Sequence, residues 1–136
     1  ERRSAEAPLA VSSKGFLREI RAQVAEALEE ADVIVFVTDA KSGITPADEA
    51  VAEWLRQSQK PLLVAANKAD NEERRLAAFE FYNLGVGEVF PLSALHGTGT
   101  GDLLDAIVAE FEQIPEEPEE PGLRLALVGR PNVGKS

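Results

Sequence analysis

The stretch that decides the fold is residues 61–70, PLLVAANKAD, in which an apolar run passes directly into a polar turn. A similar run, Val33–Val37, lies upstream and also lacks alternating polar residues. Unbroken apolar runs of this kind predict strands that are covered on both faces, as in a parallel sheet. Segments with helical periodicity lie between the runs, and this alternation predicts an α/β fold with a doubly wound, mostly parallel sheet.

The remaining elements are predicted from apolar spacing and from signals at helix ends. Apolar residues recur every three or four positions from Leu17 to Ala31, which predicts an amphipathic helix. Thr45 and Pro46 are suited to the N-cap and the first turn of the next helix. Further helices are predicted over Glu72 to about Leu84 and Asp102–Phe111, and further strands over Glu88–Leu92 and Leu123–Val128.

The chain divides into four segments. Residues 1–15 lack sustained periodicity and are predicted to be irregular, with an unseen gap among them as a hypothesis. Residues 115–121, PEEPEEP, combine three prolines with four glutamates, which favours a stiff, extended linker. Residues 16–114 are therefore assigned to one domain, and residues 122–136 to the start of a second.

Composition excludes several classes of protein. The 136 residues include no cysteine, which excludes disulfides and thiolate metal sites. A net charge of −10 argues weakly against a generic electrostatic nucleic-acid binder. No apolar run approaches the ~20 residues that cross a bilayer, so no membrane association is expected. The absence of methionine indicates a processed, truncated or partial chain.

The last eight residues, GRPNVGKS (129–136), match the pattern of a phosphate-binding loop directly after an apolar run. Glycine lets such a loop curl until successive backbone N–H groups point at phosphate oxygens. Lys135 is then expected to reach the terminal phosphates, and the Ser136 hydroxyl to bind Mg²⁺. The alternative is a chance glycine-rich turn. The predicted phosphate-binding residues are Gly129, Asn132, Val133, Gly134, Lys135 and Ser136.

A second group of candidates follows the run at 61–66. The Asp70 carboxylate can accept hydrogen bonds from N1–H and the 2-amino group of guanine, and adenine has neither donor. Asn67 is expected to bridge strand ends, and the aliphatic stem of Lys68 to pack on the purine face. The alternative is an ordinary polar turn in which Asp70 or Asn71 caps the next helix.

A third group of candidates, Ser93 and Ala94 in the turn Ser93-Ala94-Leu95, follows the predicted strand at 88–92. A small side chain and backbone N–H groups there are suited to the guanine carbonyl oxygen. Since Ser93 comes 23 residues after Asp70, with one helix and one strand between them, both turns are expected side by side at the carboxyl edge of the sheet. Two further polar residues, Asp39 and His96, are predicted to be ordinary loop residues.

With these motifs the chain resembles the Der family of tandem-domain, ribosome-assembly GTPases. The resemblance is carried by FLREIRAQ (16–23), GITP (43–46), FYNLGVG (81–87), SALHG (93–97) and the acidic linker that leads into residues 129–136. It implies an incomplete P-loop GTPase (Ras-like) domain in residues 16–114, with the guanine side at Asn67, Lys68, Asp70, Ser93 and Ala94. It also suggests that Asp39 closes the nucleotide-proximal edge without acting as a catalyst.

The resemblance implies hydrolysis of GTP to GDP and phosphate, with GTP or GDP and Mg²⁺ as ligands. It implies the large ribosomal subunit and its rRNA as partners, together with a second GTPase domain on the same chain. It further implies a cytoplasmic, bacterial-type location, and leaves an organellar version open.

The chain departs from the family pattern, since a first phosphate loop, a switch threonine and an Asp-x-x-Gly turn are all absent from its sequence. The chain alone is therefore predicted to have essentially no turnover. Two alternatives stay open. One is a circularly permuted GTPase, in which the loop at 129–136 completes the same site as Asn67 and Asp70. The other is a non-catalytic fragment that binds a nucleotide or the ribosome.

Overall fold

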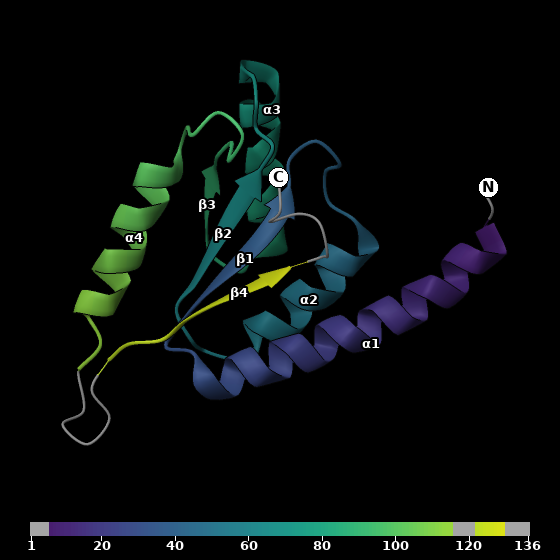
Figure 1. Cartoon of the computed structure of the whole chain (residues 1–136), viewed down its shortest axis with the longest axis horizontal. Helices are drawn as coiled ribbons and strands as arrows, with labels where there is room; N and C mark the ends of the chain where they lie inside the picture. The colour runs from purple at the N-terminus through teal and green to yellow at the C-terminus, as the bar shows by residue number, and fades with distance from the viewer. Residues whose placement is uncertain (1–5, 116–121, 130–136) are drawn as a thin grey trace.

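The computed structural model describes residues 6–115 and 122–129, with the side chains of residue 15 and of residues 17 onward. It consists of one four-stranded parallel sheet, in the order β3-β2-β1-β4, with helices on both faces (Figure 1). This architecture confirms the predicted α/β class. The elements are α1 (Glu6–Glu30), β1 (Val33–Asp39), α2 (Pro46–Arg56), β2 (Leu62–Asn67), α3 (Glu72–Ala77), the 3-10 helix η1 (Ala78–Leu84), β3 (Glu88–Pro91), α4 (Thr100–Glu112) and β4 (Leu125–Gly129).

The N-terminal helix is longer than predicted. Residues 6–15 were expected to be irregular, whereas α1 begins at Glu6. Pro8 lies in the first turn of this helix, where its missing N–H removes no intrahelical hydrogen bond. Ser12, Ser13 and Gly15 are individually weak helix formers, and each costs at most about 1 kcal/mol. Extension of an established helix is cooperative and can outweigh such costs, which local loop signals do not reveal.

Two other helices show where local signals succeed and where they are incomplete. Thr45 is the N-cap of α2, and its hydroxyl and the Asp48 carboxylate form a reciprocal capping box. The single helix predicted over 72–84 is instead divided into α3 and η1, and η1 ends at Gly85, whose φ is +67°. A left-handed residue at this position favours glycine.

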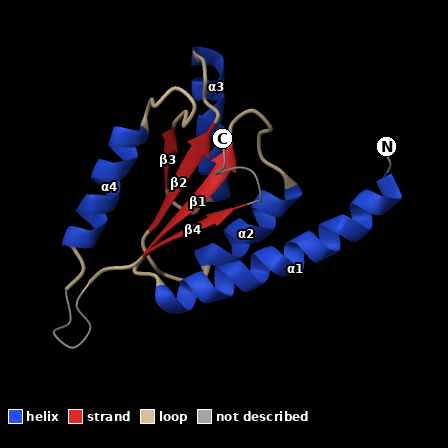
Figure 2. Ribbon diagram, in the orientation of Figure 1, coloured by secondary structure: helices blue, strands red, loops and turns tan. Residues whose placement is uncertain are grey.

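The two faces of the sheet carry separate apolar clusters. On one face, α1, α2 and η1 cover alternate residues of β1 and β2, with Phe36 and Phe81 almost completely buried. On the other face, α4 is the only helix among the described residues, and it packs through Ile107 on the remaining residues of β1 and β2 (Figure 2). Because both faces of β1 and β2 are covered, their sequences lack alternation, as predicted. In the described part of the chain, no helix has the length and apolar character required to cross a membrane.

The fourth strand was expected to begin a separate domain, but the structure places it in this sheet. β4 pairs in parallel with β1, with Val37 opposite Gly129. A Cβ at Gly129 would lie 2.6 Å from the Val37 carbonyl oxygen, so the pairing requires glycine there. Without β4, β1 would present an open edge of unpaired backbone groups, which readily pairs with an apolar strand. This pairing does not test the assignment of residues 122–136 to the start of a second domain, which stays a prediction from the sequence.

Candidate functional site

The loops that follow β1, β2 and β3 are tied together at the carboxyl edge of the sheet. Ala40 N donates to Asn67 O at 2.8 Å, and Ala69 N donates to Leu92 O at 2.9 Å. Leu92 N donates back to Ala66 O at 3.0 Å. These bonds bring polar residues from three separate segments to one edge, which is where ligands bind in open α/β sheets.

The predicted juxtaposition of Asp70 and Ser93 is confirmed. Ser93 is fully buried, and its hydroxyl donates to Asp70 Oδ1 at 2.5 Å. The same hydroxyl oxygen accepts a hydrogen bond from His96 N at 3.1 Å, so His96 takes part in the loop through its backbone. Asp70 Oδ2 lies 3.5 Å from Arg74 Nη1, and the Asp70 side chain stays 25% exposed. The carboxylate is thus held from one side and open on another.

The structure also decides which residue caps α3. Asn71 is the N-cap, and its side chain accepts a hydrogen bond from Arg74 N at 2.8 Å. The alternative in which Asp70 caps this helix is therefore not observed. Since Asn71 performs the capping, the Asp70 carboxylate is available for the site at the sheet edge.

Asn67 bridges two strand ends, as predicted. Its Oδ1 accepts a hydrogen bond at 3.0 Å from Ala94 N, in the loop after β3. The Ala94 amide was expected to donate to a ligand, and in this structure it is instead engaged inside the protein. The neighbouring Leu95 amide has no partner among the residues that the structure describes. Within the predicted Ser93-Ala94-Leu95 turn, Leu95 N–H is thus the available donor, whereas Ala94 N–H is engaged.

The loop that carries these groups is closed by short-range hydrogen bonds. Ser93 and Thr98 form an isolated antiparallel bridge, with Ser93 N donating to Thr98 O at 2.9 Å. Gly99 follows with φ +81°, and a Cβ there would lie 2.3 Å from Pro91 O. Only glycine fits this close approach, which fixes the start of α4 against the end of β3. The donors of the loop are therefore held in place before any ligand arrives.

Lys68 and Asp39 form an ion pair at the same edge. Lys68 Nζ lies 3.4 Å from Asp39 Oδ2, and the Asp39 side chain is only 10% exposed. Burial acts to raise the pKa of Asp39, but the combined effect of hydrogen bonds from Lys41 N, Ser42 N and the Ser42 hydroxyl and of the Lys68 charge outweighs it. The pKa of Asp39 therefore lies below its ordinary value, and the group is ionised at neutral pH. No local pattern of residues indicates this ion pair, because Asp39 and Lys68 follow two different strands.

The residues of this edge surround a cavity of about 270 Å³. Its walls are formed by Lys41, Asn67, Lys68, Asp70, Arg74 and Leu95. Leu95 is 75% exposed, so its apolar side chain is accessible at the rim of the cavity. The cavity thus combines a carboxylate, cationic groups and an apolar rim.

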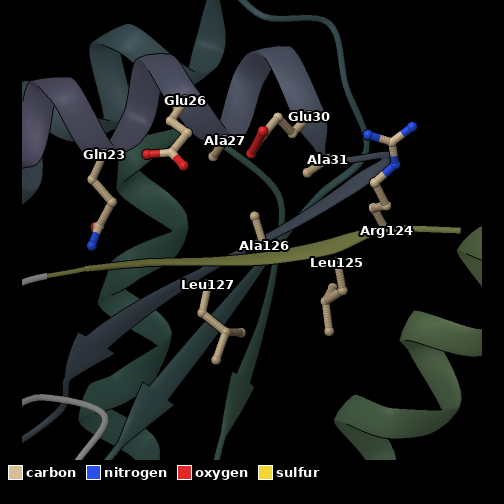
Figure 3. Close-up of a pocket in the computed structure, with 9 residues that line it drawn as sticks. All are labelled: Gln23, Glu26, Ala27, Glu30, Ala31, Arg124, Leu125, Ala126 and Leu127. Carbon is tan, nitrogen blue, oxygen red and sulfur yellow. The ribbon is translucent and has the colours of Figure 1, made fainter.

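A larger groove of about 420 Å³ lies between α1 and β4. Figure 3 shows Glu26 and Glu30 of α1 and Arg124 near β4 along this groove, with Ala126 between the two elements. None of the predicted site residues that the structure describes lines this groove. The groove is linked to them through Gly129 N, which donates a hydrogen bond to Oε1 of the lining residue Gln23 at 3.2 Å. We place the functional site at the smaller cavity, because its polar groups converge there.

Of the residues predicted to bind phosphate or Mg²⁺, the structure describes only Gly129. Gly129 ends β4, whereas Asn132, Val133, Gly134, Lys135 and Ser136 lie outside the described residues. Within residues 6–115 and 122–129, no group of three or more acidic, histidine or cysteine side chains is arranged to hold a metal ion. The assignment of Mg²⁺ to Ser136 therefore stays a prediction.

Comparison with known families gives a match that covers most of the chain. The model of the family described as "Elongation factor Tu GTP binding domain" matches residues 18–113. GTPase Der of Lactococcus lactis subsp. cremoris (strain SK11) is 52% identical over 126 residues, which is 93% of this chain. GTPase Der of Limosilactobacillus fermentum is 48% identical over the same length. The chain spans only 29% of the length of these relatives.

Solved structures support the fold alone. Translation elongation factor SelB from Methanococcus maripaludis, in complex with the GTP analogue GppNHp, superposes with a TM-score of 0.64 at 24% identity. The match covers 76% of this chain and 25% of the SelB chain. The apo form of SelB gives a TM-score of 0.61 at 23% identity.

Proposed function

Because this chain belongs to the family of the elongation factor Tu GTP-binding domain, we propose that the protein containing it binds GTP and hydrolyses it to GDP and phosphate. The observation that carries the proposal is the Asp70 carboxylate, held by the Ser93 hydroxyl at 2.5 Å beside a cavity at the carboxyl edge of the sheet. Similarity to GTPase Der over 93% of the chain supports the same activity.

Asp70 supplies the selectivity for guanine. Its carboxylate offers two oxygens, and Ser93 occupies only one lone pair of Oδ1. Guanine presents N1–H and the 2-amino group as adjacent donors, which match a carboxylate. Adenine presents an acceptor at N1 and no 2-amino group, so it would displace water from the Asp70 carboxylate without donating a hydrogen bond to it.

Other residues of the cavity provide the remaining contacts of the base. The stem of Lys68 forms one wall and Leu95 another, so a planar purine would contact apolar atoms on its faces. The Leu95 amide can donate to the guanine carbonyl oxygen, whereas the Ala94 amide already donates to Asn67 Oδ1. Asn67 holds the two loops at the spacing that these contacts require.

For the phosphates, we propose the residues of the loop at 129–136. Their backbone N–H groups and Lys135 would bind phosphate oxygens, and Ser136 would bind Mg²⁺. When bound, Mg²⁺ neutralises negative charge that develops on the phosphate oxygens. The sequence motif supports this part of the proposal.

We further propose that the protein acts in the cytoplasm on the large ribosomal subunit and its rRNA, together with a second GTPase domain of the same protein. The resemblance to the Der family supports this. Co-sedimentation of the intact protein with purified large subunits tests it. We expect binding that differs between GDP and a non-hydrolysable GTP analogue. Equal, salt-sensitive binding to any RNA would contradict the proposal, because it would indicate generic phosphate attraction.

The enzymatic proposal is tested by binding and turnover measurements on the intact protein and on the 136-residue chain. We expect the intact protein to bind GDP in preference to ADP and to release phosphate from GTP in a magnesium-dependent reaction. The chain alone is expected to show essentially no turnover. Equal affinity for GDP and ADP would refute the guanine site, and magnesium-dependent turnover by residues 1–136 would refute the predicted inactivity.

A second candidate function is favoured by the position of β4. β4 pairs with β1, with Gly129 opposite Val37 near the carboxyl end of β1. Asn67 of β2 lies opposite Asp39 at the same end of β1, so Gly129 and Asn67 share one edge of the sheet. A phosphate loop that opens at this edge could complete one nucleotide site with Asn67 and Asp70, as in a circularly permuted GTPase. Deletion of residues 130–136, which leaves β4 beside β1, distinguishes the two candidates. It should abolish GDP binding to the chain if the site is composite, and change it little if the segment belongs to a second domain.

A further inference from the structure

The backbone of Lys68 has an unusual conformation. Its φ is +66°, and among the described residues only Gln59 shares a positive φ without being glycine. For a residue with a side chain this left-handed conformation is disfavoured, and it persists only where the surrounding structure imposes it. Here the surrounding structure is the hydrogen-bonded junction of the loops after β1, β2 and β3.

Asp39 is fixed independently of Lys68. Its Oδ1 accepts hydrogen bonds from Lys41 N at 2.8 Å and from Ser42 N at 3.2 Å. Its Oδ2 accepts a hydrogen bond from the Ser42 hydroxyl at 3.1 Å and lies 3.4 Å from Lys68 Nζ. Because the loop holds the carboxylate from several sides, the ammonium is the mobile partner of the pair.

We propose that Asp39 is a positioning residue for nucleotide binding. Its carboxylate anchors the Lys68 ammonium, so that the Lys68 stem lies along the wall of the cavity before a nucleotide binds. This inference rests on the proposed guanine site and assigns to Asp39 no contact with the ligand. A free lysine side chain would lose rotamer entropy when a purine packs on it. Anchoring the ammonium in advance removes much of that cost and increases affinity without adding a contact.

The variant Asp39→Asn separates anchoring from loop structure. The asparagine oxygen can still accept from the Lys41 and Ser42 amides, so the loop is retained, whereas the amide group cannot pair with the Lys68 ammonium. The matched control is Asp32→Asn. Asp32 precedes β1 at the opposite end of the strand, where its Oδ2 accepts a hydrogen bond from Arg124 N at 2.8 Å.

The first measurement is made on the 136-residue chain without nucleotide. NMR relaxation of the Lys68 ε-methylene group should show restricted motion in the wild type and in Asp32→Asn, and free motion in Asp39→Asn. Equal mobility of Lys68 in wild type and Asp39→Asn would overturn the proposal. This measurement does not depend on the proposed function.

The second measurement is a titration with GDP, followed at the backbone amides of Ser93 and Leu95 so that only this site is observed. Asp39→Asn should weaken GDP binding about fivefold, as expected for one partly buried ion pair. IDP, which lacks the 2-amino group, should be weakened by the same factor, because the stem contacts a face of the purine. Combining Asp39→Asn with Lys68→Ala should add little to the loss from Lys68→Ala alone.

The outcomes separate the two proposals. Absence of a GDP response in the wild type would refute the guanine site, while the relaxation measurement would still decide whether Asp39 anchors Lys68. Unchanged GDP affinity in Asp39→Asn, with normal binding by the wild type, would overturn the positioning role alone. Fully additive losses in the double variant would overturn it as well.

Discussion

The variant Asp70→Asn should reverse the preference of the site from guanine to xanthine. Ser93 Oγ already accepts from His96 N, and its own proton is donated to Asp70 Oδ1 at 2.5 Å. The asparagine that keeps this bond must place its oxygen toward Ser93 and its amide group where Oδ2 now lies. The amide group would then face the two donors of guanine, whereas the C2 carbonyl of xanthine can accept from it.

The magnitude follows from the bonds that are lost. A hydrogen bond to a charged group contributes about 1.5–3 kcal/mol, and the wild-type carboxylate can accept two from guanine. Loss of one such bond weakens GDP binding roughly 10- to 150-fold, and loss of both weakens it further. The Asp70 side chain is 25% exposed before the ligand binds, so we expect values toward the lower end of this range.

The assay is a parallel titration of the intact protein with GDP and XDP, read at the Ser93 and Leu95 amides. The exposed-acid control Asp105→Asn, on α4, should keep the wild-type preference for GDP. Adding Ser93→Ala to Asp70→Asn should reduce the preference for XDP, because the orientation of the amide is no longer fixed. An unchanged ratio of the GDP and XDP affinities in Asp70→Asn would refute the role of Asp70.

Three further predictions concern the fold and the edge of the sheet. Gly129→Ala should lower the free energy of unfolding by about 1–3 kcal/mol in urea melts, because its Cβ would lie 2.6 Å from Val37 O. The control is Gly101→Ala, since the space around Gly101 is open. Equal effects of the two substitutions would argue against the position of β4 in this sheet. Thr45→Ala should lower the free energy of unfolding by about 1 kcal/mol, because it removes the hydroxyl that accepts a hydrogen bond from Asp48 N. Thr45→Ser keeps a hydroxyl and should retain most of the stability. Equal losses of stability in the two variants would exclude a role for this hydrogen bond. The pKa of Asp39 is lowered from 3.8 in the folded protein, so the ionised carboxylate stabilises the fold above that pH, and this stabilisation is lost as the pH falls through the lower folded pKa. The difference in unfolding free energy between wild type and Asp39→Asn should therefore shrink below about pH 3.8. A difference that grows with acid would contradict the lowered pKa.

Much of the fold could be predicted because the strongest signals are local. Val33–Val37 and residues 61–66 are unbroken apolar runs, and a strand buried on both faces requires this whatever its neighbours are. Thr45 and Pro46 likewise act within one helical turn, and Thr45 is the N-cap of α2 as the pattern indicates. The first part of α1, residues 6–15, was missed because its formation depends on cooperative extension over weak helix formers.

The site was predictable to the extent that it depends on strand ends. Polar residues that follow neighbouring parallel strands must share an edge, so Asp70 and Ser93 could be brought together from their spacing alone. The engagement of the Ala94 amide by Asn67 could not be predicted, because it depends on how far the loop after β3 is drawn toward β2. The availability of the Leu95 amide follows from the same closure.

The sequence by itself determined the order of strands and helices along the chain, and therefore which polar residues follow each strand. It could do so because burial and helix capping act over a few neighbouring residues. Only the tertiary structure decided that Asn71 caps α3 while Asp70 faces the cavity. It also decided that Asp39 pairs with Lys68 and that β4 lies beside β1. The last two pairings join residues distant in the chain. Their formation depends on strand register and loop closure, which no local pattern of residues encodes.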